Sequence, residues 1–359
     1  MSSTATTTNR RATVVGLGLI GGSICVALRE RGWLVSGDDQ DAQRVTEALE
    51  RGLISAAGID AESQVTFVAV PVTAISLQVQ RALDATSGIV TDVGSVKAVV
   101  TRTITDPRFI GGHPMAGSEL EGLDGADGEL FTGAVWVLTP TPTTSDAAFA
   151  TVANIVNDLG AEVVGLDPVR HDELVAIVSH VPHLTAATLM GVAGSRATEH
   201  AALLRLAAGG FRDMTRIASG HPAIWLDICA ENRPAIISTL SALIDGLSDM
   251  RTAVDTGDRA TILQRLTAAR ESRANLPSRI KALADLSEVR IPIPDRPGAA
   301  AEVFTLAAEL GVNIPNFEVV HSVEGDRGIA VVLVETTSVE LFRGGLMARG
   351  FKPSVQRLD

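Results

Sequence analysis

The sequence of 359 residues contains no run of basic side chains, no uninterrupted apolar run of membrane-spanning length, and only two cysteines. A net charge of −12 without a basic run disfavours nucleic acid and anionic membranes as partners. A membrane helix needs about 20 apolar residues, so we expect no membrane span. Cys25 and Cys229 lack metal-ligand spacing, which indicates reduced core thiols in a cytoplasmic protein. Lysine supplies only three of the 30 basic residues, a bias to which we assign no functional meaning.

The length predicts two or three domains. Residues 1–11 are rich in serine and threonine and lack an apolar core, so we predict a disordered tail there and not a signal peptide.

The most informative segment is a glycine pattern that follows a short β-branched run. Gly16, Gly18 and Gly21 have the G-x-G-x-x-G spacing, after a predicted strand at 12–15 and at the start of a predicted helix. In this pattern the first glycine allows a tight turn, the second lets the backbone approach a pyrophosphate, and the third lets helix and strand pack closely. The strand, helix and following acid are the context that the motif requires. The segment therefore predicts a dinucleotide site.

The acid after the second strand predicts which dinucleotide. Asp39 follows the predicted strand 34–36, and a carboxylate there binds ribose hydroxyls and repels a 2′-phosphate. This favours NAD over NADP. Arg44 lies close enough in sequence to keep NADP as an alternative.

Strands alternate with helical stretches as far as residue 168, which predicts a doubly wound, mostly parallel α/β Rossmann sheet over 12–168. The further strands expected after 34–36 are 65–70, 88–92, 108–111, 134–138 and 162–165. Residues 169–285 show only helical periodicity, and we predict an all-helical substrate and dimerisation domain. Residues 288–359 show the order βαββαβ of a small α+β ferredoxin-like module, with strand material at 289–293, 312–314, 318–322, 329–336 and 351–355 and an aspartate cap, Asp295, before its first helix.

Two segments place reactive side chains at predicted strand ends, where doubly wound sheets bind ligands. Ser95 follows one strand, although it could simply cap the next helix. His113 follows another, between glycines and a proline, and its ordinary pKa suits a general base. Glu119 could orient a partner or be a surface carboxylate.

The segment Ser179–His183 contains two histidines three residues apart and is predicted to open a helix. No cysteine or carboxylate stands at a convincing metal-ligand spacing, so we expect no metal. We prefer His183 as a substrate contact and interpret His180 and His171 as structural.

A glycine pair at 209–210 precedes two arginines. Arginine binds carboxylates through two parallel hydrogen bonds, so the segment suggests anion capture. Arg216 is the better candidate, and Arg212 could instead pair with a neighbouring acid. Trp225 could line the pocket or belong to the core.

Five segments, in this order and spacing, resemble prephenate dehydrogenases of tyrosine biosynthesis. They are GLGLIGGS (16–23), TDVGSVK (91–97), HPMAGSE (113–119), SHVPH (179–183) and GGFRDMTRIA (209–218) followed by Trp225. The tail resembles an ACT domain through DRPG (295–298) and GVNI (311–314).

The resemblance implies oxidative decarboxylation of prephenate to 4-hydroxyphenylpyruvate, with NAD as the acceptor. It implies that His113 is the general base, that Ser95 holds the ring hydroxyl, and that Arg216 with His183 binds the side-chain carboxylate. We expect the remaining contacts as follows: with substrate, Ser118, Glu119 and Trp225; with cofactor, Gly16, Gly18, Leu19, Ile20, Gly21, Asp39, Val70, Pro71 and Gly94.

Several alternatives stay open. Arogenate could be the substrate, since one pocket contact would decide, and another small hydroxy acid is possible if the His113 and Arg216 motifs are coincidental. A non-catalytic NAD or amino-acid sensor is the alternative from another class. We also expect a homodimer, and an aromatic amino acid, tyrosine, bound by the ACT-like module as an inhibitor; the module could instead only assist assembly.

Overall fold

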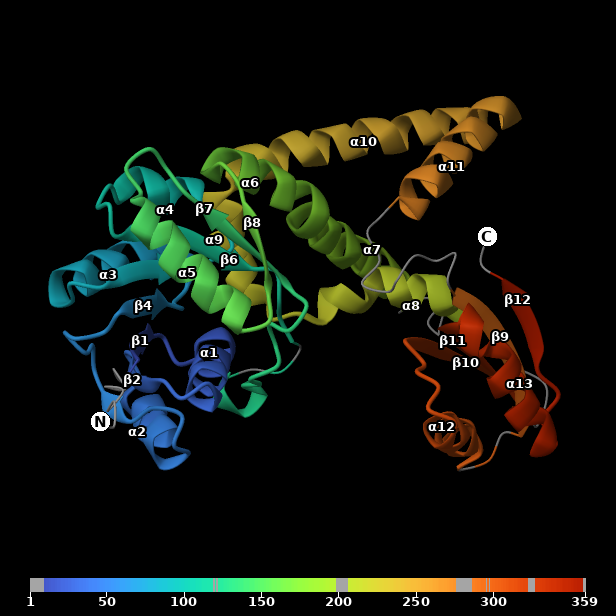
Figure 1. The fold of residues 1–359 in the computed structure, drawn as a ribbon. Helices are drawn as coiled ribbons and strands as arrows, with labels where there is room; N and C mark the ends of the chain where they lie inside the picture. The colour runs from blue at the N-terminus through green and yellow to red at the C-terminus, as the bar shows by residue number, and fades with distance from the viewer. Residues whose placement is uncertain are drawn as a thin grey trace. The chain divides into compact units, whose positions relative to one another are not determined.

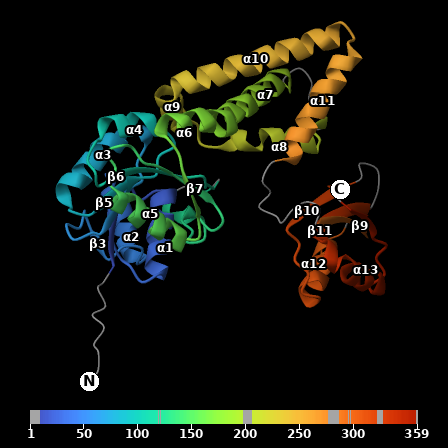
Figure 2. The same cartoon turned by 45° about the horizontal axis from the view of Figure 1, so that its top comes forward.

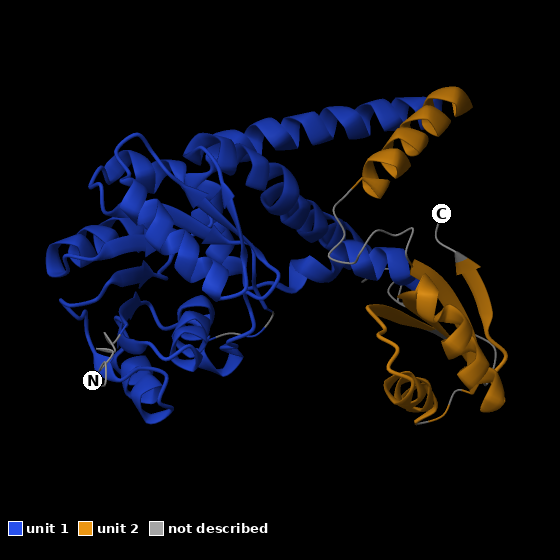
Figure 3. Cartoon of the chain, viewed as in Figure 1, with its two compact units in different colours: residues 1–256 blue, residues 257–359 orange. Residues whose placement is uncertain are grey.

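The computed structural model describes residues 10–118, 120, 122–197, 206–275, 286–294, 296, 298–321 and 327–357. Residues 1–9 of the predicted tail 1–11 lie outside the described residues, whereas Arg11 is the first residue of a strand and not part of a tail. The chain forms two compact units, residues 1–256 and 257–359 (Figure 3). The division falls inside the segment 169–285 that the periodicity groups as one helical domain. Each unit is described by itself.

Unit 1 is built on an eight-stranded sheet whose strand order is β3-β2-β1-β4-β5-β6-β7-β8 (Figures 1 and 2). All neighbouring strands are parallel except β6 and β7. The strands are β1 (Arg11–Val15), β2 (Leu34–Asp38), β3 (Ala56–Ala57), β4 (Val65–Val68), β5 (Ile89–Asp92), β6 (Phe109–Pro114), β7 (Val135–Thr139) and β8 (Glu162–Gly165).

This sheet is the predicted doubly wound one, and the strand order reverses between β1 and β4, where such folds bind nucleotides. All seven predicted strands are present. The two-residue strand β3 was not predicted, because two alanines have no preference for a strand. Strand β6 runs further than predicted and contains His113.

Helices connect the strands and cover the sheet. They are α1 (Leu19–Glu30), α2 (Ala42–Glu50), α3 (Val72–Ala85), α4 (Ala98–Thr103) and α5 (Asp146–Asp158), with a 3₁₀ turn η1 (Gly122–Gly125). Local chemistry fixes several helix starts: Asp41 accepts a hydrogen bond from Gln43 N, and Ser145 accepts one from Ala148 N. The apolar core includes the fully buried Phe67 of β4 and Trp136 of β7, whose ring centroids lie 6.3 Å apart.

The helical part of unit 1 begins with one continuous run made of α6 (Pro168–Val175), a π-helical segment η2 (Ala176–His180) and α7 (Val181–Ala197). Asp167 caps its start and Pro168 occupies the first turn. The expectation that Ser179–His183 opens a helix is therefore wrong, because the helix starts eleven residues earlier. Further elements are α8 (Gly209–Thr215), the 3₁₀ turn η4 (Arg216–Ser219), α9 (Pro222–Glu231) and α10 (Arg233–Asp255).

The run Pro168–Arg196 is long and apolar enough, by length and composition only, to cross a membrane. Its first half, however, carries buried polar side chains: His171 lies 2.9 Å from His113 on β6, Asp172 accepts hydrogen bonds from the start of α4, and His180 faces Asn232. We therefore interpret it as a packed helix of unit 1.

Unit 2 contains α11 (Arg259–Ala274) and a four-stranded sheet of order β10-β11-β9-β12 with antiparallel pairing throughout. Its elements are β9 (Leu286–Pro294), α12 (Ala299–Glu309), β10 (Asn316–His321), β11 (Arg327–Glu335), the turn η6 (Thr336–Ser338), α13 (Val339–Ala348) and β12 (Ser354–Arg357). From β9 onward the order is the predicted βαββαβ.

Two details of unit 2 differ from the prediction. Residues 312–314 form no strand, because Gly311 has a left-handed backbone and Val312 packs back into the core. Gly298, also left-handed, is the N-cap residue of α12. Asp295 and Pro297 lie outside the described residues.

Candidate active site

The glycine loop between β1 and α1 has room for a side chain at Gly18 but not at Gly16 or Gly21. A Cβ atom on Gly16 would lie 2.3 Å from Ala69 O, and one on Gly21 would lie 1.8 Å from Gly16 O. A Cβ on Gly18 would meet nothing within 4 Å, so this glycine faces open space. Helix α1 starts there without a side-chain cap. Its first N–H groups are thus available to a pyrophosphate, and the loop fits a dinucleotide.

Asp39 is held against this loop. Its Oδ2 accepts a hydrogen bond from Leu17 N at 2.7 Å, its Oδ1 accepts one from Asp41 N at 2.9 Å, and its side chain is 6% exposed. Arg44 approaches it only at 4.0 Å, whereas Asp38 binds Arg81 at 2.6 Å. A fixed carboxylate beside the glycine loop suits a ribose with free hydroxyls.

The other expected cofactor residues lie around the same edge of the sheet. Leu19 and Ile20 form the first turn of α1, and the half-buried Val70 and exposed Pro71 follow β4. Gly94 follows β5, where a Cβ would lie 2.2 Å from Ile75 Cδ1.

His113 lies on β6, at the carboxyl end of the parallel part of the sheet. Three strand spacings separate β1 from β6 in the sheet order, or about 14 Å at roughly 4.8 Å each. His113 Nδ1 lies 2.9 Å from His171 Nε2. Burial is the main reason that the pKa of His113 lies well below its usual range, with His171 and Lys97 adding to the effect. His113 is therefore uncharged at neutral pH and able to accept a proton.

A buried ion pair binds the backbone of Gly112, the residue before His113. Lys97 Nζ donates to Asp92 Oδ2 and, at 2.7 Å, to Gly112 O, and both charged side chains are fully buried. Asp92 also accepts from Gly94 N at 2.9 Å. Burial lowers the pKa of Lys97, while Asp92 opposes that shift. The pair ties the end of β5, three residues before Ser95, to β6, which contains His113.

Ser95 does not cap the following helix. Asp172 accepts hydrogen bonds from Lys97 N at 2.8 Å and Ala98 N at 2.9 Å at the start of α4. The half-buried Ser95 precedes this turn, so its hydroxyl stays available for a ligand.

The π-helical segment explains how distant histidines share one side of a helix. His171 and His183 are twelve residues apart, which at about 100° per residue would separate them by about 120° around a regular α-helix. A π turn contains one extra residue, which reduces this to about 20°. Val181 N donates to Ala176 O across the segment. Pro182 has no N–H and would clash with the carbonyl four residues earlier in a regular α-helix. This clash favours the wider π turn at this point.

Histidines and Trp225 form the next layer of the site. The ring of His183 stacks on Trp225, with centroids 3.6 Å apart and 13° between the planes. Burial lowers the pKa of His183, and it lowers that of His180 to about 4. Asn232 Nδ2 donates to Asp172 O at 2.8 Å and lies 3.1 Å from His180 Nδ1. Trp225 Nε1 is buried and has no hydrogen-bond partner in the described part of the chain.

Arg216 opens η4, which packs on α7. Gly220, just after η4, lies against both His183 and Trp225, since its Cβ would be 3.5 Å from His183 Cε1. Arg212 Nε donates to Ala207 O at 3.1 Å, and among the described residues Arg212 forms no ion pair with an acid.

The remaining expected substrate contacts lie after β6. Ser118 is exposed, and its hydroxyl accepts from Leu120 N at 3.1 Å. Glu119 lies outside the described residues.

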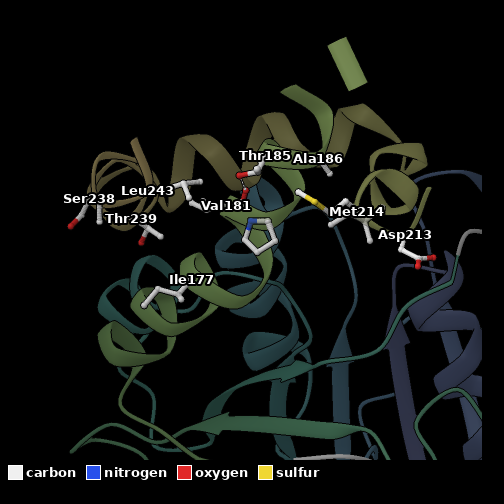
Figure 4. Close-up of a pocket in the computed structure, with 12 residues that line it drawn as sticks. Ile177, Val181, Thr185, Ala186, Asp213, Met214, Ser238, Thr239 and Leu243 are labelled. Atoms are coloured by element: carbon white, nitrogen blue, oxygen red, sulfur yellow. Dashed lines mark hydrogen bonds between the residues drawn. The ribbon is translucent and has the colours of Figure 1, made fainter. Parts of the chain in front are cut away.

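A separate pocket of about 870 Å³ lies among α7, α8 and α10 (Figure 4). Its lining is mostly apolar and includes Ile177, Val181, Met214 and Leu243. It contains neither His113 nor His183 in its lining. It is therefore distinct from the histidine cluster.

Three residues that contact His113 or its neighbours were not predicted from the sequence as part of the site. His171 was interpreted as structural, yet it hydrogen-bonds His113; Asp172 and the buried Lys97 were not singled out. Only Lys97 gave a signal, as the last residue of the segment 91–97.

Two family models match the chain. The nucleotide-binding domain of prephenate dehydrogenase matches residues 24–165, and the dimerization domain of prephenate dehydrogenase matches residues 167–268. A prephenate dehydrogenase of Bacillus subtilis is 32% identical over 335 residues, which cover 88% of this chain and 90% of the relative.

Solved structures give the same result. Prephenate dehydrogenase from Aquifex aeolicus, in complex with hydroxyphenyl propionate and NAD⁺, is 26% identical with a TM-score of 0.70, over 75% of this chain and 98% of that one. Arogenate dehydrogenase from Synechocystis is 30% identical with a TM-score of 0.64, over 73% and 98%.

Proposed function

The chain belongs to the prephenate dehydrogenase family, and on that basis we propose that it oxidatively decarboxylates prephenate to 4-hydroxyphenylpyruvate with NAD. The observation that carries the proposal is the placement of an uncharged, buried histidine, His113, on the same sheet edge as a glycine loop that fits a dinucleotide. A hydride acceptor and a proton acceptor are what the oxidation of a ring alcohol requires.

His113 accepts the proton of the ring hydroxyl while hydride leaves the ring carbon that bears this hydroxyl. When bound, NAD supplies the hydride acceptor. The ring carboxylate then leaves as carbon dioxide, and its bonding electrons complete the aromatic ring. His113 returns its proton to the phenolate oxygen, so no net proton is consumed. Ser95, whose hydroxyl is not used as a helix cap, holds the ring oxygen beside His113.

Arg216 and His183 bind the side-chain carboxylate in this proposal, and Trp225 supports His183 by stacking. A guanidinium forms two parallel hydrogen bonds to a carboxylate. Fixing that end of the substrate holds its ring in register with His113, and such positioning is itself a large part of catalysis.

The test is NADH formation by the purified chain with prephenate, run beside arogenate and beside NADP. Turnover with prephenate and NAD supports the proposal. Turnover with neither substrate, together with retained NAD binding, would favour a sensor without catalytic activity.

Arogenate is the second candidate substrate, because a structure named arogenate dehydrogenase is 30% identical to this chain. The two substrates differ in an amino group in place of a keto group. Turnover of arogenate alone would keep the roles of His113 and Arg216 and change the substrate.

We also assign unit 2 an ACT-like regulatory role with tyrosine as the ligand. Support comes from the βαββαβ order and from a core that contains only residues of that unit. The Bacillus match covers 88% of the chain, more than the first 268 of 359 residues can provide, so it reaches into this unit. Removal of residues 286–359 should abolish tyrosine inhibition; inhibition that persists would place tyrosine in the active site.

A homodimer is the proposed assembly. The matched dimerization domain supports it, and so does a stripe of exposed apolar side chains on α10: Ile237, Ile244, Leu247 and Val254. Their spacing of seven, three and seven residues is that of a helix seam that packs on another helix.

A further inference from the structure

His113 is the end of a hydrogen-bonded chain that leads into the interior. Its Nδ1 lies 2.9 Å from His171 Nε2, and His171 Nδ1 lies 2.8 Å from Asp172 Oδ1. His171 is fully buried, and Asp172 is 5% exposed. The chain joins β6 to α6, which are 58 residues apart at the two histidines.

Asp172, at the buried end of these hydrogen bonds, determines which ring nitrogens of His171 and His113 carry a proton. Asp172 accepts two backbone hydrogen bonds, from Lys97 N and Ala98 N, which favour the ionised carboxylate. An ionised carboxylate only accepts hydrogen bonds, so His171 must donate from Nδ1. A neutral His171 then has a lone pair on Nε2, and His113 must donate to it from Nδ1.

A positively charged His171 would give the opposite result, because it would donate from both nitrogens and His113 Nδ1 would accept. The surroundings disfavour this arrangement. His171 is fully buried, Asp172 is already compensated by two N–H groups, and the ammonium of Lys97 lies nearby on Gly112, the residue before His113. A second buried cation here would be costly.

We propose that His171 and Asp172 are positioning residues that fix His113 as its Nδ1–H tautomer and leave Nε2 as the atom that accepts the proton. The catalytic meaning rests on the proposed function, in which His113 is the base; the tautomer itself does not. The logic is that of a carboxylate that orients a base through a hydrogen bond, here with a second imidazole inserted between carboxylate and base.

His180 provides an internal reference for the test. Asn232 Nδ2 donates to Asp172 O, so the amide nitrogen is placed without ambiguity and also faces His180 Nδ1. His180 Nδ1 therefore accepts, and its proton lies on Nε2. The cluster should contain both tautomers.

The first experiment is ¹⁵N–¹H correlation NMR of the full chain labelled at histidine, at neutral pH and without substrate. His113→Gln and His171→Gln identify the resonances. We expect Nδ1–H for His113 and His171, against the Nε2–H form that free imidazole prefers and that His180 should keep. An Nε2–H form of His113 would overturn the proposal, whether or not the chain turns over prephenate.

The second experiment compares two variants of one side chain. In His171→Gln the amide can still accept from His113, but the bond to Asp172 is lost. In His171→Asn the amide keeps the contact with Asp172, but His113 Nδ1 loses its acceptor. We expect His171→Asn to lower kcat about 10- to 100-fold, as the loss of an orienting partner does, with KM for NAD unchanged, and His171→Gln, which keeps an acceptor for His113 but loses the link to Asp172, to lower kcat less.

A purely structural His171 predicts the reverse order, because the bond to the anchored Asp172 would then matter more. Equal losses in both variants, with unfolding temperature and NAD affinity preserved, would also overturn the proposal. If either variant fails to fold, the tautomer of His113 in the wild-type chain still tests the proposal.

Discussion

At the scale of single residues, the site is a set of uncharged histidines kept neutral by burial. His113, His180 and His183 all have lowered pKa values, and burial is the first cause in each case. Their roles differ because their partners differ: His113 faces His171, His180 faces Asn232, and His183 stacks on Trp225.

His113→Asn should lower kcat by about 10²- to 10⁴-fold, the usual contribution of a general base, with little change in KM for prephenate. Steady-state kinetics with prephenate and NAD provide the measurement. Near-wild-type turnover in this variant would remove His113 from the mechanism.

Arg216→Ala should act on binding instead. Loss of a charge-assisted carboxylate contact of about 1.5–3 kcal/mol corresponds to a KM for prephenate raised about 10- to 100-fold. Arg212→Ala is the matched control, because Arg212 already donates to Ala207 O and should change KM little. If Arg212→Ala raised KM more than Arg216→Ala, Arg212 and not Arg216 would be the residue that binds the carboxylate.

Stability should fall as the pH drops below about 6.5. The unfolded histidines take up protons near that value, whereas folded His180 does so only at about 4. The unfolded state thus binds more protons, and each such group costs about 1.4 kcal/mol per pH unit across that window. Thermal unfolding between pH 7 and 5 measures the slope. His180→Gln should reduce it; His221→Asn, at an exposed helix cap, should leave it unchanged, and an equal reduction in both would contradict the assignment.

At the scale of elements, the glycine loop and the π-helical segment do the positioning. Deleting Val178, an exposed residue of the segment, removes the extra residue, so His183 stays about 20° from His171 on a regular helix and kcat/KM should change little. Inserting an alanine after Val178 instead rotates His183 by about 100° away from the side of His171, and we expect a loss of at least tenfold in kcat/KM with the NAD affinity retained. Equal activity in the two variants would show that the register set by the π turn has no such role.

The same elements show what sequence could and could not predict. Gly16, Gly18 and Gly21 predicted their loop because backbone sterics act over a few residues. The contact between His113 and His171 was not predictable, since it depends on how a helix docks on a sheet 58 residues later. The π segment left a signal in Pro182, within a helical pattern, that was interpreted as a helix start.

At the scale of the whole molecule, the apolar stripe on α10 is the feature that requires a partner. Leu247→Glu places a charge in the stripe, where Leu247 is 59% exposed, and should shift the chain from dimer to monomer in sedimentation or light scattering. Leu77→Glu, at a 71% exposed position on α3, is the control and should stay dimeric. Dissociation by both changes, or by neither, would place the interface elsewhere.

The stacking of Trp225 on His183 also has an optical consequence. The chain has three tryptophans and no tyrosine, so its intrinsic ultraviolet emission comes from indole alone. Trp33 and Trp136 are buried in the core, at 5% and 0% exposure, whereas Trp225 stacks on His183. A neighbouring imidazole quenches indole more strongly once it is protonated, and a carboxylate bound at His183 would favour that protonation. In the proposed site, the fluorescence of Trp225 would thus report on carboxylate binding at His183 without an added label.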